Sequence, residues 1–428
     1  MFSLSMAPGR ARAGQAGLAA LFTAMLLQAG CATQSVKRVD ATPPEHAETE
    51  LPEEKLVNIN IAMFDPNIPE SVEEQEAEYI FPEVRKAESR YMPVMLRDTL
   101  QSTGQWGAVR VVPEPIPWSE LLVSGRILQS DGLELKLQIT AEDASGREWL
   151  DRTYSHEAAK LNYRPEVLAR TDPFQAVYNR IADDLLEARR QLESSELVAL
   201  RRVSELRFGA DIAPAAYSRY LAAKGGRYSV KGLPAADDPF RQRIEQIRAR
   251  DYALIDSLDQ HYQLFRTQID PNYDEWRSAA YTEVEAYNTL SRQSLTRKLA
   301  GAAAVVAGVA GLITAGGSGG SNPSSGDIRR GSAQSAASVG AIAAGVYMFK
   351  SGLDKGRESE LHAASLEELG RSLESDVKPT VVELENQTVT LSGSAEQQYE
   401  DWRKLLHRIY AEETGLVSNG EDAENQAR

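Results

Sequence analysis

One cysteine, five histidines and several pairs of adjacent acids are the residues with the most evident chemical potential in this sequence. The histidines are His46, His156, His261, His362 and His407. None of them stands three or four residues from a second ligand type in a recognised metal-site pattern. Acidic pairs such as Asp183-Asp184 and Glu367-Glu368 are typical of the solvated faces of helices. These residues therefore predict neither a metal site nor catalytic residues.

Motifs that bind phosphate or carry a catalytic nucleophile are also missing from the sequence. The glycine-rich run at residues 316–320 leads into a loop, whereas a phosphate-binding loop leads into a helix that bears Lys-Ser/Thr. No G-x-S-x-G nucleophile motif is present. We therefore expect a non-enzymatic protein without a cofactor, while an enzyme with an unrecognised chemistry stays open as an alternative.

The single cysteine, Cys31, lies directly after an apolar run near the amino terminus. The segment consists of Arg10 and Arg12, an apolar stretch at residues 18–27 and the small pair Ala29-Gly30. A charged start, a short apolar run and small residues predict a secretory signal peptide, because a membrane span would need about 20 apolar residues. With no second cysteine, an exported chain can form no internal disulfide, and the thiol can serve as an acyl attachment point.

Residues 26–31 resemble the lipobox of bacterial lipoproteins, in which the cysteine is lipidated and becomes the first residue of the mature chain. Gln28 departs from the pattern, because an aliphatic residue is expected three positions before the cysteine. In that family an aspartate after the cysteine favours the inner membrane, so Ala32 implies a lipid anchor on the periplasmic face of the outer membrane. Residues 1–31 are thus predicted to be a lipoprotein signal peptide with lipidation at Cys31. A plain secretory signal with an incidental cysteine is the alternative.

The charge of the chain argues against nucleic acid as a partner. The net charge is −15 at pH 7, and no stretch of clustered Lys and Arg interrupts this acidity. Residues 41–54 are rich in Pro and Glu, so residues 32–55 are expected to form a disordered tether. The rest of the chain is long enough for two or three compact units.

Residues 56–160 are expected to form a small α/β sandwich, so the predicted fold class is α+β. Strands are expected at residues 56–64, 107–113, 121–128, 133–143 and 147–154, with a loop at 65–82 and a helix at 83–104. Pro93 predicts a kink or a break in that helix. Turn residues at 130–132 and 143–146 predict hairpins. A β-α-β unit should therefore lead into an antiparallel meander, with one helix covering the sheet.

Residues 121–149 carry the pattern v-x-G-x-I, then a hairpin, then D-x-x-G-x-x-W. This run is similar to the small α/β domains of several periplasmic proteins, among them the curli-secretion lipoproteins and the Tol-type envelope proteins. The resemblance implies a module for assembly or interaction, and it supplies no catalytic residues.

Residues 161–298 are expected to form a helical region. One helix is predicted to begin after Asp172-Pro173 and to cover most of residues 174–209, and a loop is predicted at 227–240. A second helix is predicted to begin after Asp238-Pro239 and to break at Pro271. Aromatic residues are dense along it, among them Tyr252, Tyr262, Phe265, Tyr273, Trp276, Tyr281 and Tyr287. They favour core packing, with a face that stacks on glycans or peptides as the alternative.

Small residues recur every four positions on both sides of a Gly/Ser-rich loop and predict a helical hairpin over residues 299–356. The predicted helix-packing residues are Ala303, Ala307, Gly308, Gly311 and Ala315 in the first arm, and Ala336, Gly340 and Ala344 in the second. The spacing resembles the glycine-zipper segments of outer-membrane lipoproteins, and it lets helix backbones approach closely. The first arm reaches about 25 Å, which leaves two interpretations open. The hairpin is either buried in a protein assembly or inserted in the membrane.

Residues 357–415 are expected to form a polar helix and a ββα unit that docks on another part of the chain. A capping box at Ser394 and Gln397 marks the start of the last helix. The apolar face of that helix comprises Tyr399, Trp402, Leu405, Leu406 and Ile409. A disordered acidic tail is expected at residues 416–428.

These features together predict a scaffold for envelope assembly or secretion. Such a protein would be lipid-anchored to the membrane, and it would form homo-oligomers or a larger complex with envelope proteins. The alternative is a subunit of a membrane-embedded export channel that uses the hairpin at residues 299–349.

Overall fold

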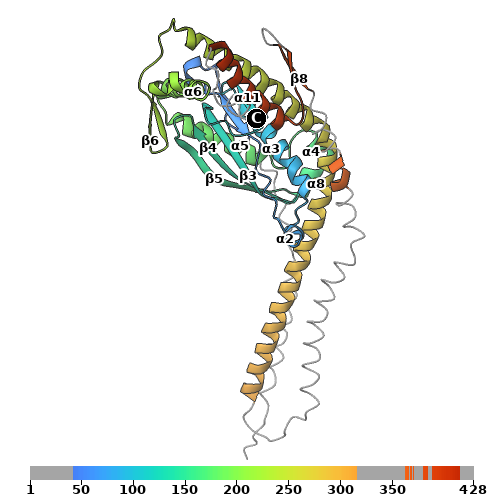
Figure 1. The fold of residues 1–428 in the computed structure, drawn as a ribbon. Helices are drawn as coiled ribbons and strands as arrows, with labels where there is room; N and C mark the ends of the chain where they lie inside the picture. The colour runs from blue at the N-terminus through green and yellow to red at the C-terminus, as the bar shows by residue number, and fades with distance from the viewer. Residues whose placement is uncertain are drawn as a thin grey trace, which may run out of the picture. The chain divides into compact units, whose positions relative to one another are not determined.

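The computed structural model describes residues 42–315, 362–365, 367, 368, 370, 379–383 and 388–414, which belong to one compact unit, Asp40–Arg428. It confirms the predicted α+β class, because a five-stranded sheet is combined with long helices (Figure 1). The predicted acidic tail and four of the predicted site residues lie outside the described part of the chain. These residues are Cys31, Ala336, Gly340 and Ala344.

The sheet contains strands β1 (Ile59–Ala62), β2 (Val109–Val112), β3 (Leu121–Ser130), β4 (Glu134–Asp143) and β5 (Glu148–Glu157), in the order β2-β1-β3-β4-β5. Strand β1 is parallel to β2 and β3, whereas β3, β4 and β5 pair in antiparallel fashion. Parallel neighbours need a crossover, and helix α3 (Pro82–Ser102) provides it between β1 and β2. The predicted β-α-β unit and the antiparallel meander are thus confirmed.

Aspartates close the two hairpins of the meander, as their turn chemistry predicts. The carboxylate of Asp131 accepts hydrogen bonds from the backbone N–H groups of Leu133 and Glu134 at 2.9 and 2.7 Å. Asp143 accepts backbone N–H groups in the same way in the second turn. Gly132 has a φ of +78°, which a residue with a side chain adopts only with strain.

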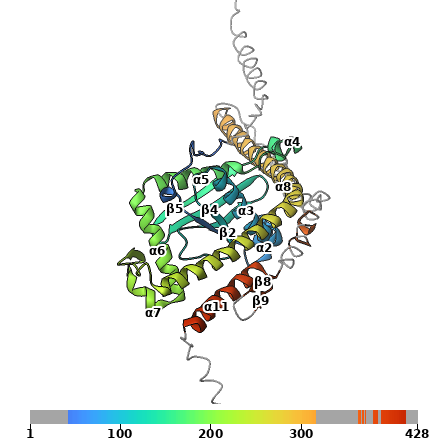
Figure 2. The same ribbon diagram turned by 90° about the horizontal axis from the view of Figure 1, so that it is seen from above.

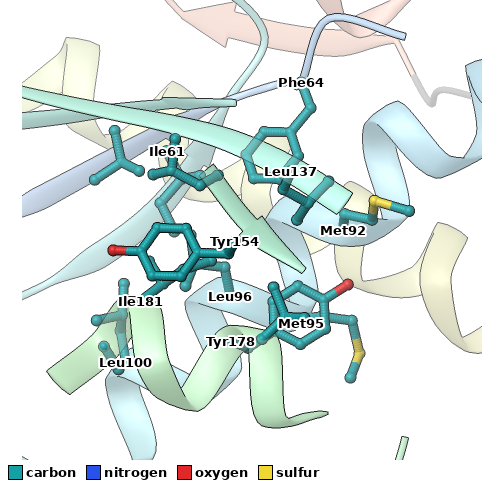
Figure 3. Close-up of a cluster of buried hydrophobic side chains, with 14 of the residues drawn as sticks. Ile61, Phe64, Met92, Met95, Leu96, Leu100, Leu137, Tyr154, Tyr178 and Ile181 are labelled. Atoms are coloured by element: carbon teal, nitrogen blue, oxygen red, sulfur yellow. The ribbon is translucent and has the colours of Figure 1, made fainter. Parts of the chain in front are cut away.

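Two helices, α3 and α5 (Gln175–Arg190), pack against one face of the sheet, where one helix was predicted. Figure 3 shows Leu96 and Leu100 of α3 gathered with Ile181 of α5 and Leu137 of β4 in one buried cluster. Helix α3 continues through Pro93, so the predicted break does not occur. The proline is held in the helix by burial on both sides of it, which outweighs the missing hydrogen bond.

The helices that flank the sheet differ from the prediction in local detail. The expected loop at 65–82 contains α2 (Val72–Ala77). The single helix predicted after Asp172-Pro173 is two helices, α5 and α6 (Ser194–Ile212), because the chain turns between them. The carboxylate of Glu196 accepts the backbone N–H of Glu193 at 3.0 Å and so fixes the start of α6. The shorter elements are η1 (Glu53–Lys55), η2 (Lys160–Tyr163), α4 (Pro165–Leu168), α7 (Pro214–Tyr217) and η3 (Ser218–Tyr220).

A small hairpin of β6 (Leu221–Lys224) and β7 (Arg227–Val230) occupies part of the loop predicted at 227–240. The two residues between its strands, Gly225 and Gly226, have φ values of +58° and +77°. A two-residue turn that needs positive φ at both positions favours Gly-Gly. The glycine pair was therefore a signal for this hairpin that the prediction missed.

Helix α8 (Pro239–Ala315) is 77 residues long and continues through Pro271, so the predicted break is wrong. Buried residues on both sides, Ile269 and Tyr273, hold the helix against the rest of the fold at this point. Five of the seven aromatic residues named in the sequence analysis are buried, which confirms core packing for them, whereas Tyr252 is only half-buried and Tyr287 is 55% exposed. The buried five are Tyr262, Phe265, Tyr273, Trp276 and Tyr281.

The carboxyl-terminal ββα unit forms as predicted and comprises β8 (Thr380–Glu383), β9 (Thr388–Leu391) and α11 (Ala395–Thr414). Ser394 and Gln397 make the reciprocal hydrogen bonds of the capping box at 3.1 and 3.3 Å. The whole predicted apolar face of α11 is buried in a core shared with α6 and α8. Figure 2 shows α11 alongside α8, so the predicted docking of this unit is confirmed. Residues 362–365 have helical backbone, within the expected polar helix.

Residues 42–55, which were expected to belong to a disordered tether, instead lie against α3 and α5 and, at η1, against α6. The backbone N–H of Ala47 donates to the carbonyl oxygen of Thr103 at 2.8 Å. The Asn179 side chain donates to the carbonyl oxygen of Thr42 at 2.8 Å. The composition of this stretch could not predict these contacts, because they use backbone groups that every residue has.

Candidate functional site on the long helix

Helix α8 carries the predicted helix-packing residues of the first arm. Ala303, Ala307, Gly308, Gly311 and Ala315 all lie in its last part, so the predicted helix over residues 299–315 is confirmed. The first part of the same helix packs against α3, β2, α6 and α11. Within residues 239–289 of α8 the last buried residue is Tyr281. Figure 1 shows the carboxyl-terminal part of α8, coloured orange, extending past the sheet. Four buried polar contacts fix its docked part.

The first contact joins α8 to α3 and to the edge strand β2. Nη1 of Arg97, which is 1% exposed, donates to both carboxylate oxygens of Asp259 at 2.9 Å. The same carboxylate accepts the backbone N–H of Val111 in β2 at 2.8 Å. Burial raises the pKa of Asp259, while the hydrogen bond from Val111 and the charge of Arg97 oppose the rise. Asp259 thus pairs with a buried cation and also satisfies a backbone N–H donor on the edge strand of the sheet.

The second contact centres on Glu88 of α3, which is fully buried. Its Oε1 accepts hydrogen bonds from the hydroxyl of Ser130 at 2.5 Å and from the hydroxyl of Tyr273 at 2.7 Å. Arg85 lies 3.4 Å from the other carboxylate oxygen. Burial raises the pKa of Glu88, and the nearby charge of Arg85 opposes the rise. Glu88 therefore ties α8 to α3 and to the end of β3 in one place.

One helical turn further on, Arg277 of α8 is buried and pairs with two acids. Its Nη1 donates to Asp172, just before α5, at 2.7 Å, and its Nη2 donates to Asp274. The guanidinium also lies over the ring of Tyr273, 4.4 Å from the centroid. Gly132 brings the β3–β4 turn so close that a Cβ atom there would lie 2.4 Å from the Arg277 carbonyl oxygen. Close packing and paired charges thus set the rotation of α8 about its axis.

The fourth contact joins α8 to α11 and α6 around Asp251. The indole N–H of Trp402 donates to Asp251 at 3.1 Å, and Arg403 lies 3.6 Å from the same oxygen. Arg403 also pairs with Asp211 of α6 and lies over the ring of Trp118, 4.5 Å from the centroid. Burial raises the pKa of Asp251 to about 6, and the charge of Arg403 opposes the rise.

The buried acids and arginines of these contacts are used for packing between helices. Within the described ranges, no group of three or more His, Cys, Asp or Glu side chains is placed to hold a metal ion. Asp184, one of the acids predicted to be solvated, accepts hydrogen bonds from Arg152 and from the hydroxyl of Tyr154, both at 2.6 Å. What this arrangement can do is hold a long helix in a fixed orientation on a sheet.

Membrane insertion of the hairpin stays a prediction. Of the helices that the structure describes, none combines the length and the hydrophobicity that a bilayer span requires. The second arm of the hairpin, with Ala336, Gly340 and Ala344, lies outside the described residues, as does Cys31. The docked contacts of α8 were not predicted, because single charged residues on an amphipathic helix have the same pattern whether they face solvent or a buried partner.

Comparisons with protein-family models, with curated proteins and with solved structures gave no match. The features of the chain that bear on function are therefore the sequence pattern around Cys31 and residues 299–349, together with the geometry of α8.

Proposed function

We propose that this protein is a non-enzymatic outer-membrane lipoprotein that acts as a scaffold in envelope assembly or secretion. Cys31 is the proposed site of lipidation, and the periplasmic side of the membrane is the proposed location. The observation that carries the scaffold proposal is the continuity of α8. One end of this helix is docked through buried ion pairs, and the other end carries small residues at four-residue spacing.

The length of α8 supports a role in assembly. At about 1.5 Å per residue, the part of α8 from Tyr281 to Ala315 spans about 50 Å. Small residues every four positions allow a second helix to approach closely, so this part of α8 suits a helix–helix contact. A helix whose docked end cannot rotate would present that row of small residues in one direction. We propose that a second copy of the chain or an envelope protein packs against it.

The proposal is tested by replacing small residues of this row with leucine, in full-length protein purified in detergent. Ala307→Leu and Gly311→Leu add bulk to the row, whereas Ala302→Leu adds the same bulk on the opposite side of the helix by helical register. Light scattering after size-exclusion chromatography should show a smaller assembly for the first two variants only. A wild-type protein that is monomeric and captures no envelope protein by cross-linking would exclude the scaffold.

A second experiment separates the scaffold from the export channel. Cys31→Ala removes the proposed acyl attachment point, and alkaline washing of membranes then shows what else holds the protein. Release of the variant into the soluble fraction would support a lipid anchor with a hairpin that packs against protein. Retention in the membrane would instead favour insertion of residues 299–349 and the channel function.

A further inference from the structure

A cavity of about 190 Å³ lies between α6, α7, the loop after β7 and the first turns of α8. Figure 2 shows α6 and α7 beside the beginning of α8, remote from the small-residue end of that helix. Arginines, glutamates, a tyrosine and aliphatic side chains line it. This site is independent of the scaffold function proposed above.

Two polar groups of the lining residues lack partners within the described part of the chain. The Tyr217 side chain is 4% exposed, and its buried hydroxyl makes no hydrogen bond there. The buried Nε of Arg248 makes none either. Burying such groups unpaired is unfavourable, so polar groups left without partners in a cavity are suited to hydrogen-bond to a ligand. Burial raises the pKa of Tyr217 to about 12, which keeps its hydroxyl protonated and able to donate.

The charges of the lining favour an anion. Glu245 is paired with Arg241 at 2.8 Å, and Glu205 lies 3.7 Å from Arg248, so each acid is matched by an arginine. Arg202 makes no ion pair with any residue that the structure describes, and its positive charge is left over. An arginine of this kind, next to a hydroxyl donor, is suited to bind a carboxylate.

The remaining wall of the cavity is apolar. Leu206 and Ile244 are buried, and Pro234 and the half-exposed Leu233 complete this side. The volume is below the roughly 300 Å³ at which pockets for drug-sized ligands begin, so it fits a group about the size of one amino-acid residue. An apolar wall opposite an arginine and a hydroxyl matches a small molecule with an apolar end and a charged end.

We propose that this cavity binds a carboxylate attached to a small apolar group. Arg202 and Nε of Arg248 would pair with the carboxylate, the hydroxyl of Tyr217 would donate to it, and Leu206 and Ile244 would contact the apolar part. The carboxyl-terminal residue of a peptide and a free small organic acid share this chemistry.

The test is calorimetric titration of the full-length protein in detergent with N-acetyl-leucine and with N-acetyl-leucinamide, which lacks only the charge. The acid should bind at least tenfold more tightly than the amide. Pentapeptides ending in leucine, with a free or an amidated end, distinguish the two sources: tighter binding of the free-ended peptide than of N-acetyl-leucine indicates a peptide terminus. Equal binding of acid and amide would overturn the proposal, as would no binding at millimolar concentration.

Matched variants locate the binding. Tyr217→Phe removes only the unpaired hydroxyl, and Arg202→Gln removes only the unpaired charge, so both should fold with a melting temperature no lower than that of the wild type. Each should weaken the binding of N-acetyl-leucine at least threefold, while Arg170→Gln, a change at an exposed arginine outside the lining, should leave it unchanged. Inorganic phosphate that binds as tightly as the acid, with the same dependence on Arg202, would show a general anion site and contradict the apolar part of the proposal.

Discussion

Arg97 of α3 and Asp259 of α8 are 162 residues apart in the sequence and form a buried ion pair in which one guanidinium nitrogen donates to both carboxylate oxygens. The pair continues into a chain of alternating charges, because Arg97 also contacts Asp98 at 2.6 Å and Asp98 contacts Arg266 of α8 at 3.0 Å. Each cation of this chain therefore has an acidic partner on the other helix: Arg97 of α3 pairs with Asp259 of α8, and Arg266 of α8 pairs with Asp98 of α3. Removing one member leaves a buried charge without its partner.

Arg97→Met is therefore expected to lower the free energy of unfolding by about 3–5 kcal/mol. The matched control is Arg126→Met, which breaks the pair with Asp65, where the two side chains are 54% and 44% exposed. Solvent screens that pair, so its loss should cost less than about 1 kcal/mol. Urea unfolding of the full-length chain, followed by tryptophan fluorescence, measures both. Similar small losses for the two variants would show that the pair does not hold α8 in place.

Gly132→Ala tests the close approach of the β3–β4 turn to α8. The added Cβ atom would lie 2.4 Å from the Arg277 carbonyl oxygen and 2.7 Å from the Tyr281 nitrogen, with a φ of +78°. Gly226 has nearly the same φ, +77°, but a Cβ atom there meets nothing within 4 Å. Gly226→Ala should therefore lower the free energy of unfolding by only about 1–2 kcal/mol, the cost of the left-handed backbone conformation for a residue with a side chain. Gly132→Ala should lower the free energy of unfolding by clearly more in the same urea experiment. Equal decreases for the two variants would contradict the close contact.

Pro271→Ala should stabilise the protein, because α8 is helical through this position. A proline inside a helix lacks one N–H donor and crowds the preceding turn, at a cost of about 3 kcal/mol, part of which is offset by its stiffening of the unfolded chain. The expected gain in the free energy of unfolding is about 1–2 kcal/mol. The control is Pro165→Ala at the first position of α4, where proline is favoured and no gain is expected. A loss of stability in Pro271→Ala would show that the helix is broken there.

Local signals in the sequence predicted the parts of the fold that depend on local chemistry. The turns at Asp131 and Asp143, the alternation of the meander strands and the capping box at Ser394 all form as predicted. The errors arise where tertiary packing outweighs a local rule. Pro271 predicts a break and Pro93 a kink or a break, yet both helices continue through their prolines because the neighbouring side chains are buried.

The candidate site was predictable only in part. The four-residue spacing from Ala303 to Ala315 is visible in the sequence, and the structure places these residues on one helix. The docking of that helix was not predictable, because Asp251 and Asp259 have the same local pattern as solvated acids. Their partners Arg403 and Arg97 lie more than 150 residues away along the chain, and only the folded topology brings them together.

Asp251 should make the stability of the α8–α11 contact depend on pH. Burial raises the pKa of this carboxyl from 3.8 to about 6, so the unfolded chain loses the proton before the folded chain does. The stability that this group contributes is therefore fully present below about pH 4 and is lost as the pH rises through 6. A shift of this size corresponds to at most about 3 kcal/mol. The groups that face this carboxyl do not titrate between pH 4 and 7; they are Arg403, Arg248 and the Trp402 indole.

Asp251→Asn isolates this effect from every other group that titrates between pH 4 and 7. The amide keeps an oxygen that can accept from Trp402, but it has no proton to lose. The free energy of unfolding, measured by urea at several pH values, should fall more steeply with rising pH in the wild type than in the variant. The difference should level off above about pH 7, because both wild-type states are then ionised. Parallel pH profiles for the two proteins would mean that Asp251 is ionised in the folded state well below pH 6, with Arg403 compensating its burial.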